Sequence, residues 1–421
     1  MRTVAALLAL ALVTAAASCS HRERANPLDA GNPDTGGAPQ NFNAIADANA
    51  VELSWLAQPE LAIDGFQIFR LAPGDAAFQA ITGVLPTSTS RFFDVRVAQG
   101  LDYQYRIHFV VRGEIAANWA QDVATPGPLV PWVADPDRGR VLRLSPDGRD
   151  VAFARTGFGS VSALAASPGH GPLWVADELA GTLYILDPGT FLGVRNNTAS
   201  HPAAIALDPI NGSAWVSDRN STSGAVFHFQ EDGSAALPAS LLLLDDPVGI
   251  ATDPNDASVW VTEFNGNRVR HFQQDGLRLG ARDLLFPARV AVDSTTHVAW
   301  VTSIASGWVW RLSPTLAVID SFRLQSPVGV ALDWRRRTVW ICDVDGDALV
   351  AVDMDAFPRI ERFRVNGLGN PWDAAVDFSN GDVWVVARGS ARAFRISATG
   401  RQLASAPGLG DPFQIRLDPG Q

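Results

Sequence analysis

The segment Pro247-Val-Gly-Ile-Ala-Thr-Asp253, followed by Val259-Trp-Val-Thr-Glu263, decides the fold of this chain. Both segments are short, rich in apolar and β-branched residues and bounded by turn-forming residues, which is typical of β-strands. The first carries small residues at Gly249 and Ala251, and the second is centred on Trp260. The same pair recurs along the chain, so it is the unit of a repeat.

A tryptophan at the same place marks each copy of the repeat. Successive markers lie 40 to 45 residues apart, and they are Trp132, Trp174, Trp215, Trp260, Trp300, Trp340 and Trp384. Six of them follow, by seven residues, the end of a first strand at Ser167, Asp208, Asp253, Asp293, Asp333 or Asp377. This period predicts a seven-bladed β-propeller over residues 128–421, with four strands in each blade. The small residues of the first strand suit the crowded innermost position.

The two ends of this region complement each other. Trp132 lacks a first strand of its own, whereas Pro412-Phe-Gln-Ile-Arg-Leu-Asp418 is a first strand with no tryptophan after it. We therefore expect the C-terminal strand to pair beside the strand of Trp132 and to complete the first blade. Such closure covers the sheet edges that an open array would expose.

Residues 41–127 show a different pattern of short alternating strands. They read as strands at Val51–Trp55, Gly65–Arg70, Arg91–Asp94 and Leu101–Phe109, which predicts an antiparallel sandwich. Alternation places Tyr103, Tyr105, Ile107 and Phe109 in its core. Leu53-Ser54-Trp55 and the turn into Tyr103 resemble a fibronectin type III domain. That resemblance implies an all-β chain in which a spacer or binding unit precedes the propeller.

The N-terminal segment has the order of a secretory signal. Arg2 precedes an apolar run from Val4 to Val13, and Ala15-Ala16-Ala17-Ser18-Cys19 follows. Residues 1–19 resemble a bacterial lipoprotein signal, which implies a lipid on Cys19, although Ala16 stands where leucine is favoured. Ordinary cleavage near Ala17 is the alternative. Ser20 resembles the outer-membrane sorting context, so the resemblance implies an exported protein anchored to the outer membrane.

Residues 20–40 are rich in Asn, Pro, Asp and Gly and have no periodic apolar positions. This composition predicts a flexible tether between the anchor and the folded part.

Composition excludes several classes of function. The formal charge of −11 and the pI near 5.1 argue against a nucleic-acid partner, because phosphate binding requires a basic surface. All 33 basic residues are arginine, which rules out Schiff-base lysines and a phosphate-loop lysine. The two cysteines, Cys19 and Cys342, do not form a disulfide framework, and Cys342 is expected to be buried in a strand.

The repeat itself resembles a known group of propellers. Its pattern of Pro-x-x-[Ile/Val]-Ala-x-Asp, then Trp-Val-x-[Asp/Glu], looks like the NHL and related propellers, which include streptogramin lyase-like and gluconolactonase-like proteins. The resemblance implies the architecture and carries no activity with it.

The third residue after each tryptophan is the first candidate for chemistry. Carboxylates stand there in five copies, at Asp135, Asp177, Asp218, Glu263 and Asp343. Five carboxylates on one face could hold a hard cation such as Ca²⁺. The preferred interpretation is that each accepts hydrogen bonds from its own following turn. The stretch Asp343–Asp347 lacks the glycine and glutamate positions of an EF-hand loop, so it is read as a repeat turn.

The histidines give no metal-ligand motif. His228 and His271 occupy the third-strand place that Arg143, Arg311 and Arg395 hold in other copies. We therefore expect both histidines to be exposed.

The loops that lead into the first strands form a candidate ligand-binding rim. Its residues are His201, Asp246, Asn370, Trp372 and Asp411. Amidating-lyase propellers carry several histidines at comparable loops to bind zinc, and only His201 is found here. The mixed rim could bind a small polar ligand or a peptide; solvated loop residues are the alternative. No catalytic residue, metal site or cofactor is predicted, with Ca²⁺ or Zn²⁺ as the minority interpretation.

These observations favour a non-enzymatic binding or scaffold protein of the cell envelope. It would contact the membrane through its lipid and a protein, peptide or glycan through one face of the propeller. The alternative is a metal-assisted hydrolase or lyase of the gluconolactonase or streptogramin lyase type, with its site at the centre of that face.

Overall fold

The computed structural model describes residues 28–32, 36–46, 50–99, 101–127, 129–167, 172–187, 192–197, 199–208, 211–219 and 224–418. The predicted signal and its lipidation residue Cys19 lie outside these residues. Two compact units make up the chain, and the larger contains the residues from Ala124 onward. Within the described ranges, no helix combines the length and the apolar character needed to span a bilayer.

The larger unit is a β-propeller. Its described strands from β8 onward form seven four-stranded antiparallel sheets, each running from an inner to an outer strand. The sheets are β35 (Gln414–Asp418), β8 (Val130–Asp135), β9 (Arg140–Leu144), β10 (Val151–Thr156); β11 (Val161–Ala166), β12 (Leu173–Asp177), β13 (Thr182–Leu186), β14 (Gly193–Asn196); β15 (Pro202–Leu207), β16 (Ala214–Asp218), β17 (Gly224–Phe229), β18 (Ala235–Leu244); β19 (Pro247–Thr252), β20 (Val259–Glu263), β21 (Arg268–Phe272), β22 (Arg278–Asp283); β23 (Arg289–Asp293), β24 (Val298–Thr302), β25 (Trp308–Leu312), β26 (Val318–Arg323); β27 (Pro327–Asp333), β28 (Thr338–Asp343), β29 (Ala348–Asp353), β30 (Glu361–Asn366); and β31 (Pro371–Val376), β32 (Val383–Ala387), β33 (Arg392–Ile396), β34 (Gln402–Ala406).

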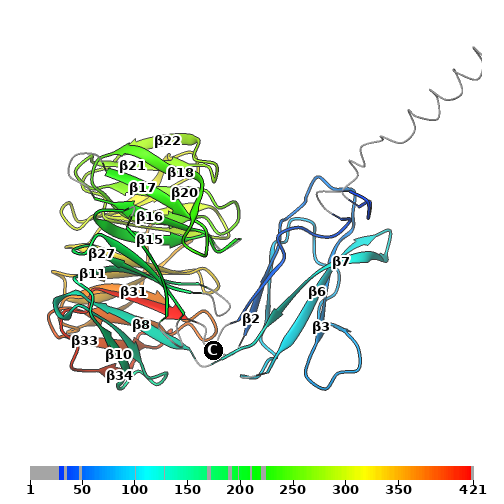
Figure 1. The fold of residues 1–421 in the computed structure, drawn as a ribbon, viewed down its shortest axis with the longest axis horizontal. Coiled ribbons are helices and arrows are strands. Elements are labelled where there is room, and N and C mark those ends of the chain that lie inside the picture. The colour runs from blue at the N-terminus through cyan, green and yellow to red at the C-terminus, as the bar shows by residue number, and fades with distance from the viewer. Residues whose placement is uncertain are drawn as a thin grey trace, which may run out of the picture. The chain divides into compact units, whose positions relative to one another are not determined.

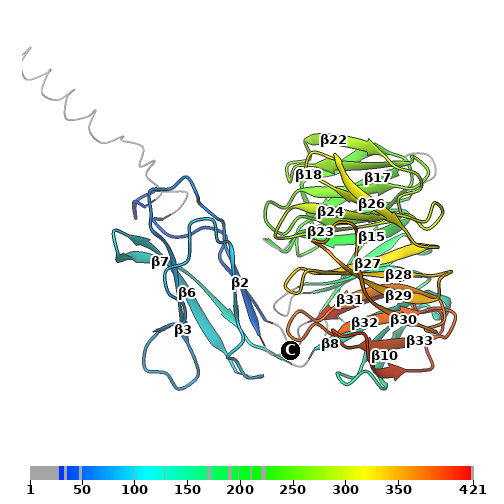
Figure 2. The same cartoon turned by 180° about the vertical axis from the view of Figure 1, so that it is seen from behind.

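The inner strands form a closed ring. Each contacts the next in the order β11, β15, β19, β23, β27, β31, β35, and β35 contacts β11 again. The predicted closure is confirmed, because Ile415 pairs with Val133 and Leu417 pairs with Pro131. Figure 1 shows the last strand, in red, beside β8 and β31. Seen from behind, β28, β29 and β30 lie side by side as the outer strands of one blade (Figure 2).

The repeat residues have the positions that their sizes require. All seven marker tryptophans are fully buried, and they fill the space between neighbouring blades. A side chain on Gly249 would place its Cβ 2.4 Å from the carbonyl oxygen of Ala288 in the approach to the next inner strand. A side chain on Gly329 would meet the oxygen of Trp372 at 2.7 Å. The inner strands are therefore too close together for larger residues at these two positions.

The N-terminal strands form two further sheets. One has the order β1 (Asn43–Ala46), β2 (Val51–Ser54), β5 (Arg91–Asp94), and the other has the order β4 (Gln79–Ala80), β3 (Gly65–Leu71), β6 (Tyr103–Val111), β7 (Glu114–Ala124). The four residues expected in the core of this part, from Tyr103 to Phe109, are buried. Sequence reading missed β1, β4 and β7, and β7 is the longest strand among the described residues.

Candidate functional site

The carboxylates after the marker tryptophans act as hydrogen-bond acceptors for the backbone. Asp177 accepts the N–H groups of Gly159 (2.7 Å) and Ser160 (2.8 Å). Asp218 likewise accepts from Ser200 and His201. The prediction that the donors lie in the turn after each carboxylate was mostly wrong. The donating N–H groups belong mainly to the segment that leads into the inner strand of the same blade. Each carboxylate therefore fixes the start of an inner strand.

The first blade uses the same device on residues far apart in the sequence. Asp135 follows β8, yet it accepts the N–H groups of Gly410 (3.0 Å) and Asp411 (2.9 Å) ahead of β35. Its Oδ2 also accepts from Arg140 at 2.6 Å. Asp135 thus positions the closing strand by the same type of contact that Asp177 makes within one blade.

The expectation that His228 and His271 are exposed was wrong, since both are buried. The His228 ring stacks on Trp215 with centroids 3.9 Å apart, and the His271 ring stacks on Trp260 at 4.0 Å. In other blades an arginine lies over the marker tryptophan instead, as Arg311 does over Trp300. A flat cation or a flat imidazole can cover an indole face, so the repeat position is defined by stacking.

The rim residues lie where inner strands begin, on the side of the propeller that we call the entry face. His201 is exposed, and its Nδ1 lies 3.2 Å from the hydroxyl of Ser200. Asp246 forms an ion pair with Arg219, whose Nε lies 2.7 Å from Asp246 Oδ1. Asn370 is exposed, has a positive φ of 57°, and donates its backbone N–H to Asp347. Asp246 and Asn370 are thus bound to other loops, whereas the His201 side chain contacts the residue before it.

Trp372 and Asp411, in contrast, are brought together. Arg388 forms an ion pair with Asp411, and its guanidinium lies 4.5 Å from the Trp372 ring centroid. Trp372 also packs on Phe413, with ring centroids 5.7 Å apart. Trp372 comes from β31, Phe413 from the segment before β35, and Arg388 from the residue directly after β32.

Sequence reading missed the residues that complete this centre. Arg289 is the first residue of β23, and its guanidinium contacts the aromatic ring of Phe413. Phe413 directly precedes β35, an inner strand that is not a neighbour of β23 in the propeller. Arg416 of β35 forms an ion pair with Asp373 of β31 at 2.7 Å. We call Arg289, Trp372, Asp373, Arg388, Phe413 and Arg416 the axial cluster. A signal was present: six blades have alanine where the seventh has Arg416, two residues before the end of the inner-strand motif.

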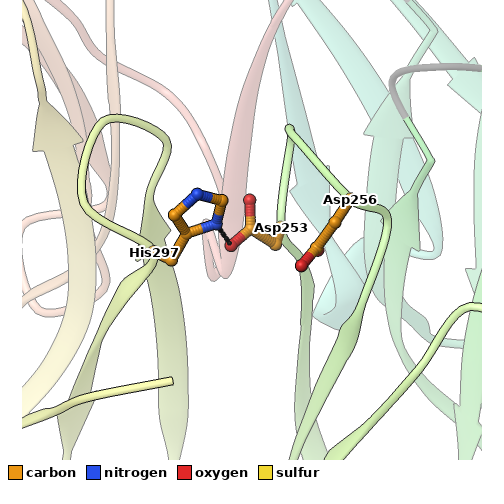
Figure 3. A group of neighbouring side chains, drawn as sticks. All are labelled: Asp253, Asp256 and His297. Atoms are coloured by element: carbon orange, nitrogen blue, oxygen red, sulfur yellow. Dashed lines mark hydrogen bonds and ion pairs between the residues drawn. The ribbon is translucent and has the colours of Figure 1, made fainter. Parts of the chain in front are cut away.

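A second group of titratable residues lies at the opposite ends of the inner strands. Asp253, Asp256 and His297 have potential ligand atoms within 4.8 Å of one another, and Figure 3 shows the His297 ring directed at Asp253. His297 Nδ1 lies 2.7 Å from Asp253 Oδ2. In the next blade Arg337 occupies the same repeat position and forms an ion pair with Asp293 at 2.8 Å. His297 is therefore explained as the histidine form of a contact between blades.

We expect this contact to make stability depend on pH. The hydrogen bond to Asp253 raises the pKa of His297, burial opposes the change, and the charges of Asp253, Asp256 and Asp293 add to the rise. A raised pKa stabilises the folded state below the unfolded value near 6.5, and this contribution disappears as pH rises through the folded value. His297→Ala should therefore destabilise the protein more at about pH 5.5 than at about pH 9 in urea unfolding.

Arg337→Ala is the matched control for this prediction. A guanidinium stays charged across that pH range, so the loss caused by Arg337→Ala should be the same at both pH values. Equal losses for His297→Ala at the two pH values would contradict the assignment.

Comparisons with known proteins identify the fold. No family model matches the chain, and a search of curated proteins gives no match either. A functionally unknown protein from Desulfotomaculum acetoxidans is similar in structure, with a TM-score of 0.60, 13% identity and coverage of 69% of this chain and 99% of that chain. A putative 6-phosphogluconolactonase from Bacteroides uniformis has a TM-score of 0.56 and 14% identity, and the match covers 69% of this chain and 99% of that chain. Virginiamycin B lyase from Staphylococcus aureus has a TM-score of 0.52 and 15% identity, and the match covers 69% of this chain and 95% of that chain. At these identities the likeness shows a β-propeller and no activity.

Proposed function

We propose that this chain is a non-enzymatic binding or scaffold protein of the bacterial cell envelope. The propeller presents its entry face to a protein, peptide or glycan, and residues 1–19 are a signal that leads to lipidation of Cys19 and an outer-membrane location. Residues 41–127 are a fibronectin type III-like spacer, and the propeller is of the NHL-related type. Incorporation of a lipid label that is lost in Cys19→Ser tests the anchor.

The axial cluster is the observation that carries the binding function. Trp372 and Phe413 are partly exposed rings in contact with each other, and Arg388 lies over both. Tryptophan and arginine are the residue types that most often dominate binding energy at protein interfaces. Rigid rings at the start of inner strands lose little conformational entropy when a ligand binds.

The metal-assisted hydrolase or lyase is less well supported. Such an enzyme needs free carboxylates or histidines at the centre of the entry face. Asp246, Asp373 and Asp411 each form an ion pair with an arginine there. An arginine beside each carboxylate competes with a cation for the same oxygen atoms. The likeness to lactonase and lyase structures concerns the fold alone.

A direct test measures ligand capture by the full chain. A random-peptide display library and a glycan array should each be probed with the wild-type protein and with Trp372→Ala. We expect at least one class of probe to bind, and Trp372→Ala to weaken it by about tenfold or more. Trp119→Ala is the matched control, because Trp119 is an exposed indole of β7, 44% accessible, in the smaller unit.

Two outcomes would overturn the proposal. Binding that is lost in Trp119→Ala and kept in Trp372→Ala would move the site away from the propeller. Stoichiometric calcium or zinc in the purified protein, together with turnover of a lactone or cyclic peptide ester, would favour the enzyme.

A further inference from the structure

Charged residues interrupt the small residues of the inner strands. Glycine or alanine stands four residues before the end of the motif in four blades, at Ala163, Ala204, Gly249 and Gly329. The other three blades carry Arg289, Asp373 and Gln414 at that place. Gln414 has a structural role, because its Oε1 accepts a hydrogen bond from the N–H of Leu164 in the neighbouring inner strand. Arg289, Asp373 and the extra Arg416 remain to be explained.

Two of these charges satisfy each other. Asp373 Oδ2 accepts from Arg416 Nη1 at 2.7 Å and from the N–H of Ile415 at 3.1 Å. Arg416 Nη1 also donates to the carbonyl of Ile415. The carboxylate of Asp373 therefore has one arginine partner and one backbone donor, and it neutralises a single guanidinium.

Arg289 has no carboxylate within ion-pair distance among the residues that the structure describes. Its Nη1 donates to the carbonyl of Val248 at 2.9 Å, and its guanidinium lies 5.7 Å from the Phe413 ring centroid. Burial lowers the pKa of Arg289, the charge of Asp373 partly offsets this, and the like charges of Arg416 and Arg219 lower it further. The group remains a cation, so among the described residues Arg289 and Arg416 share the single carboxylate of Asp373, and one positive charge is left over.

A guanidinium that is only partly exposed has lost part of its hydration, and a bound anion can replace what was lost. Within the described residues, Arg289 and Arg416 each donate side-chain hydrogen bonds through Nη1, and their Nε and Nη2 atoms donate none. The side chain of Arg416 is 32% accessible, and Arg289 is partly exposed. A guanidinium group with free donors can form two parallel hydrogen bonds to the oxygens of one carboxylate or phosphate, which the ammonium group of a lysine cannot do.

We propose that the axial cluster binds an oxyanion group of the ligand, a carboxylate or a phosphate, through Arg289 with the help of Arg416. The inference rests on the proposed binding function and names the chemistry of its ligand. Trp372 and Phe413 would contact the apolar part next to the anionic group. The surrounding ion pairs of Arg388 with Asp411 and of Arg219 with Asp246 keep those two carboxylates from repelling the ligand.

The experiment uses two probes on the full chain at constant ionic strength. Citrate represents carboxylates and inorganic phosphate represents phosphates, and calorimetric titration measures both affinities. We expect one probe to bind clearly better, which identifies the source of the oxyanion. Arg289→Gln keeps a donor for Val248 and removes the charge, and it should weaken that probe by about tenfold or more. Arg289→Lys keeps the charge without the fork and should give an intermediate loss.

Arg149→Gln is the matched control, because Arg149 is a 71% accessible arginine 3.8 Å from Asp147 in a turn of the first blade. It should bind as the wild type does. Equal binding by Arg289→Gln, equal loss in Arg149→Gln, or failure of both probes to bind the folded wild type would each overturn the oxyanion site. In those cases capture of a library ligand that depends on Trp372 would leave the proposed function standing.

Discussion

Removal of residues 412–421 is expected to lower the melting temperature by about 10 °C or more. The deletion removes β35, whose Ile415 is fully buried and pairs with Val133. It also removes the side chain of Gln414 from the N–H of Leu164 and that of Arg416 from Asp373. The buried apolar contacts and the exposed edge of β8 each cost several kcal/mol in order of magnitude, so their sum exceeds any single substitution in a blade.

Thermal unfolding followed by circular dichroism measures this effect. A chain that ends at Asp418 keeps all of β35 and is the control, and we expect it to melt as the full chain does. An unchanged melting temperature after removal of residues 412–421 would show that the ring does not depend on its closing strand.

Trp260→Ala is expected to reduce the free energy of unfolding by roughly 3–5 kcal/mol. Trp260 is fully buried, stacks on His271 and packs against residues of the next blade such as Val290 and Val301. Its loss leaves a cavity between two blades and removes the face on which His271 lies. Because blades are held by their neighbours, the loss should spread to the adjacent blade.

Trp260→Phe separates packing from hydrogen bonding. The indole Nε1 is buried and has no partner among the described residues, so phenylalanine removes no hydrogen bond there. We expect Trp260→Phe to lose clearly less than Trp260→Ala in urea unfolding. Equal losses would mean that the ring face contributes little and that a contact of the indole nitrogen matters instead.

The architecture could be predicted from the sequence because every blade repeats the same packing problem. A buried tryptophan, a crowded inner strand and an acceptor after the second strand recur at a fixed period, as Trp260, Gly249 and Glu263 illustrate. The closing strand could also be predicted, since Trp132 lacked an inner strand and Leu417 belonged to one without a tryptophan.

The axial cluster could not be predicted in the same way. Arg289 and Phe413 lie far apart in the sequence and meet only when the ring has closed. The rim interpretation selected Asp246 and Asp411 and did not include their partners Arg219 and Arg388. A comparison of each repeat position across blades would have drawn attention to Arg416, because it replaces alanine.

The error over His228 had a physical cause. The expectation came from Arg143, Arg311 and Arg395, which hold the same repeat position in other blades and were expected to point into solvent. In this propeller the flat ring of a marker tryptophan lies beside that position and attracts another flat group. The residue types at this repeat position therefore could not distinguish a stacked histidine from a solvated one.

The sharing of one sheet by β8 and β35 also sets the order of events when the chain is made. β8 leaves the ribosome before the other six blades, and its partner β35 follows only after all of them. Bringing them together requires a very long loop to close, which makes this pairing a late step of folding. The propeller must therefore remain an incomplete ring until β35 has been synthesised, and a chaperone has that whole interval in which to act on it.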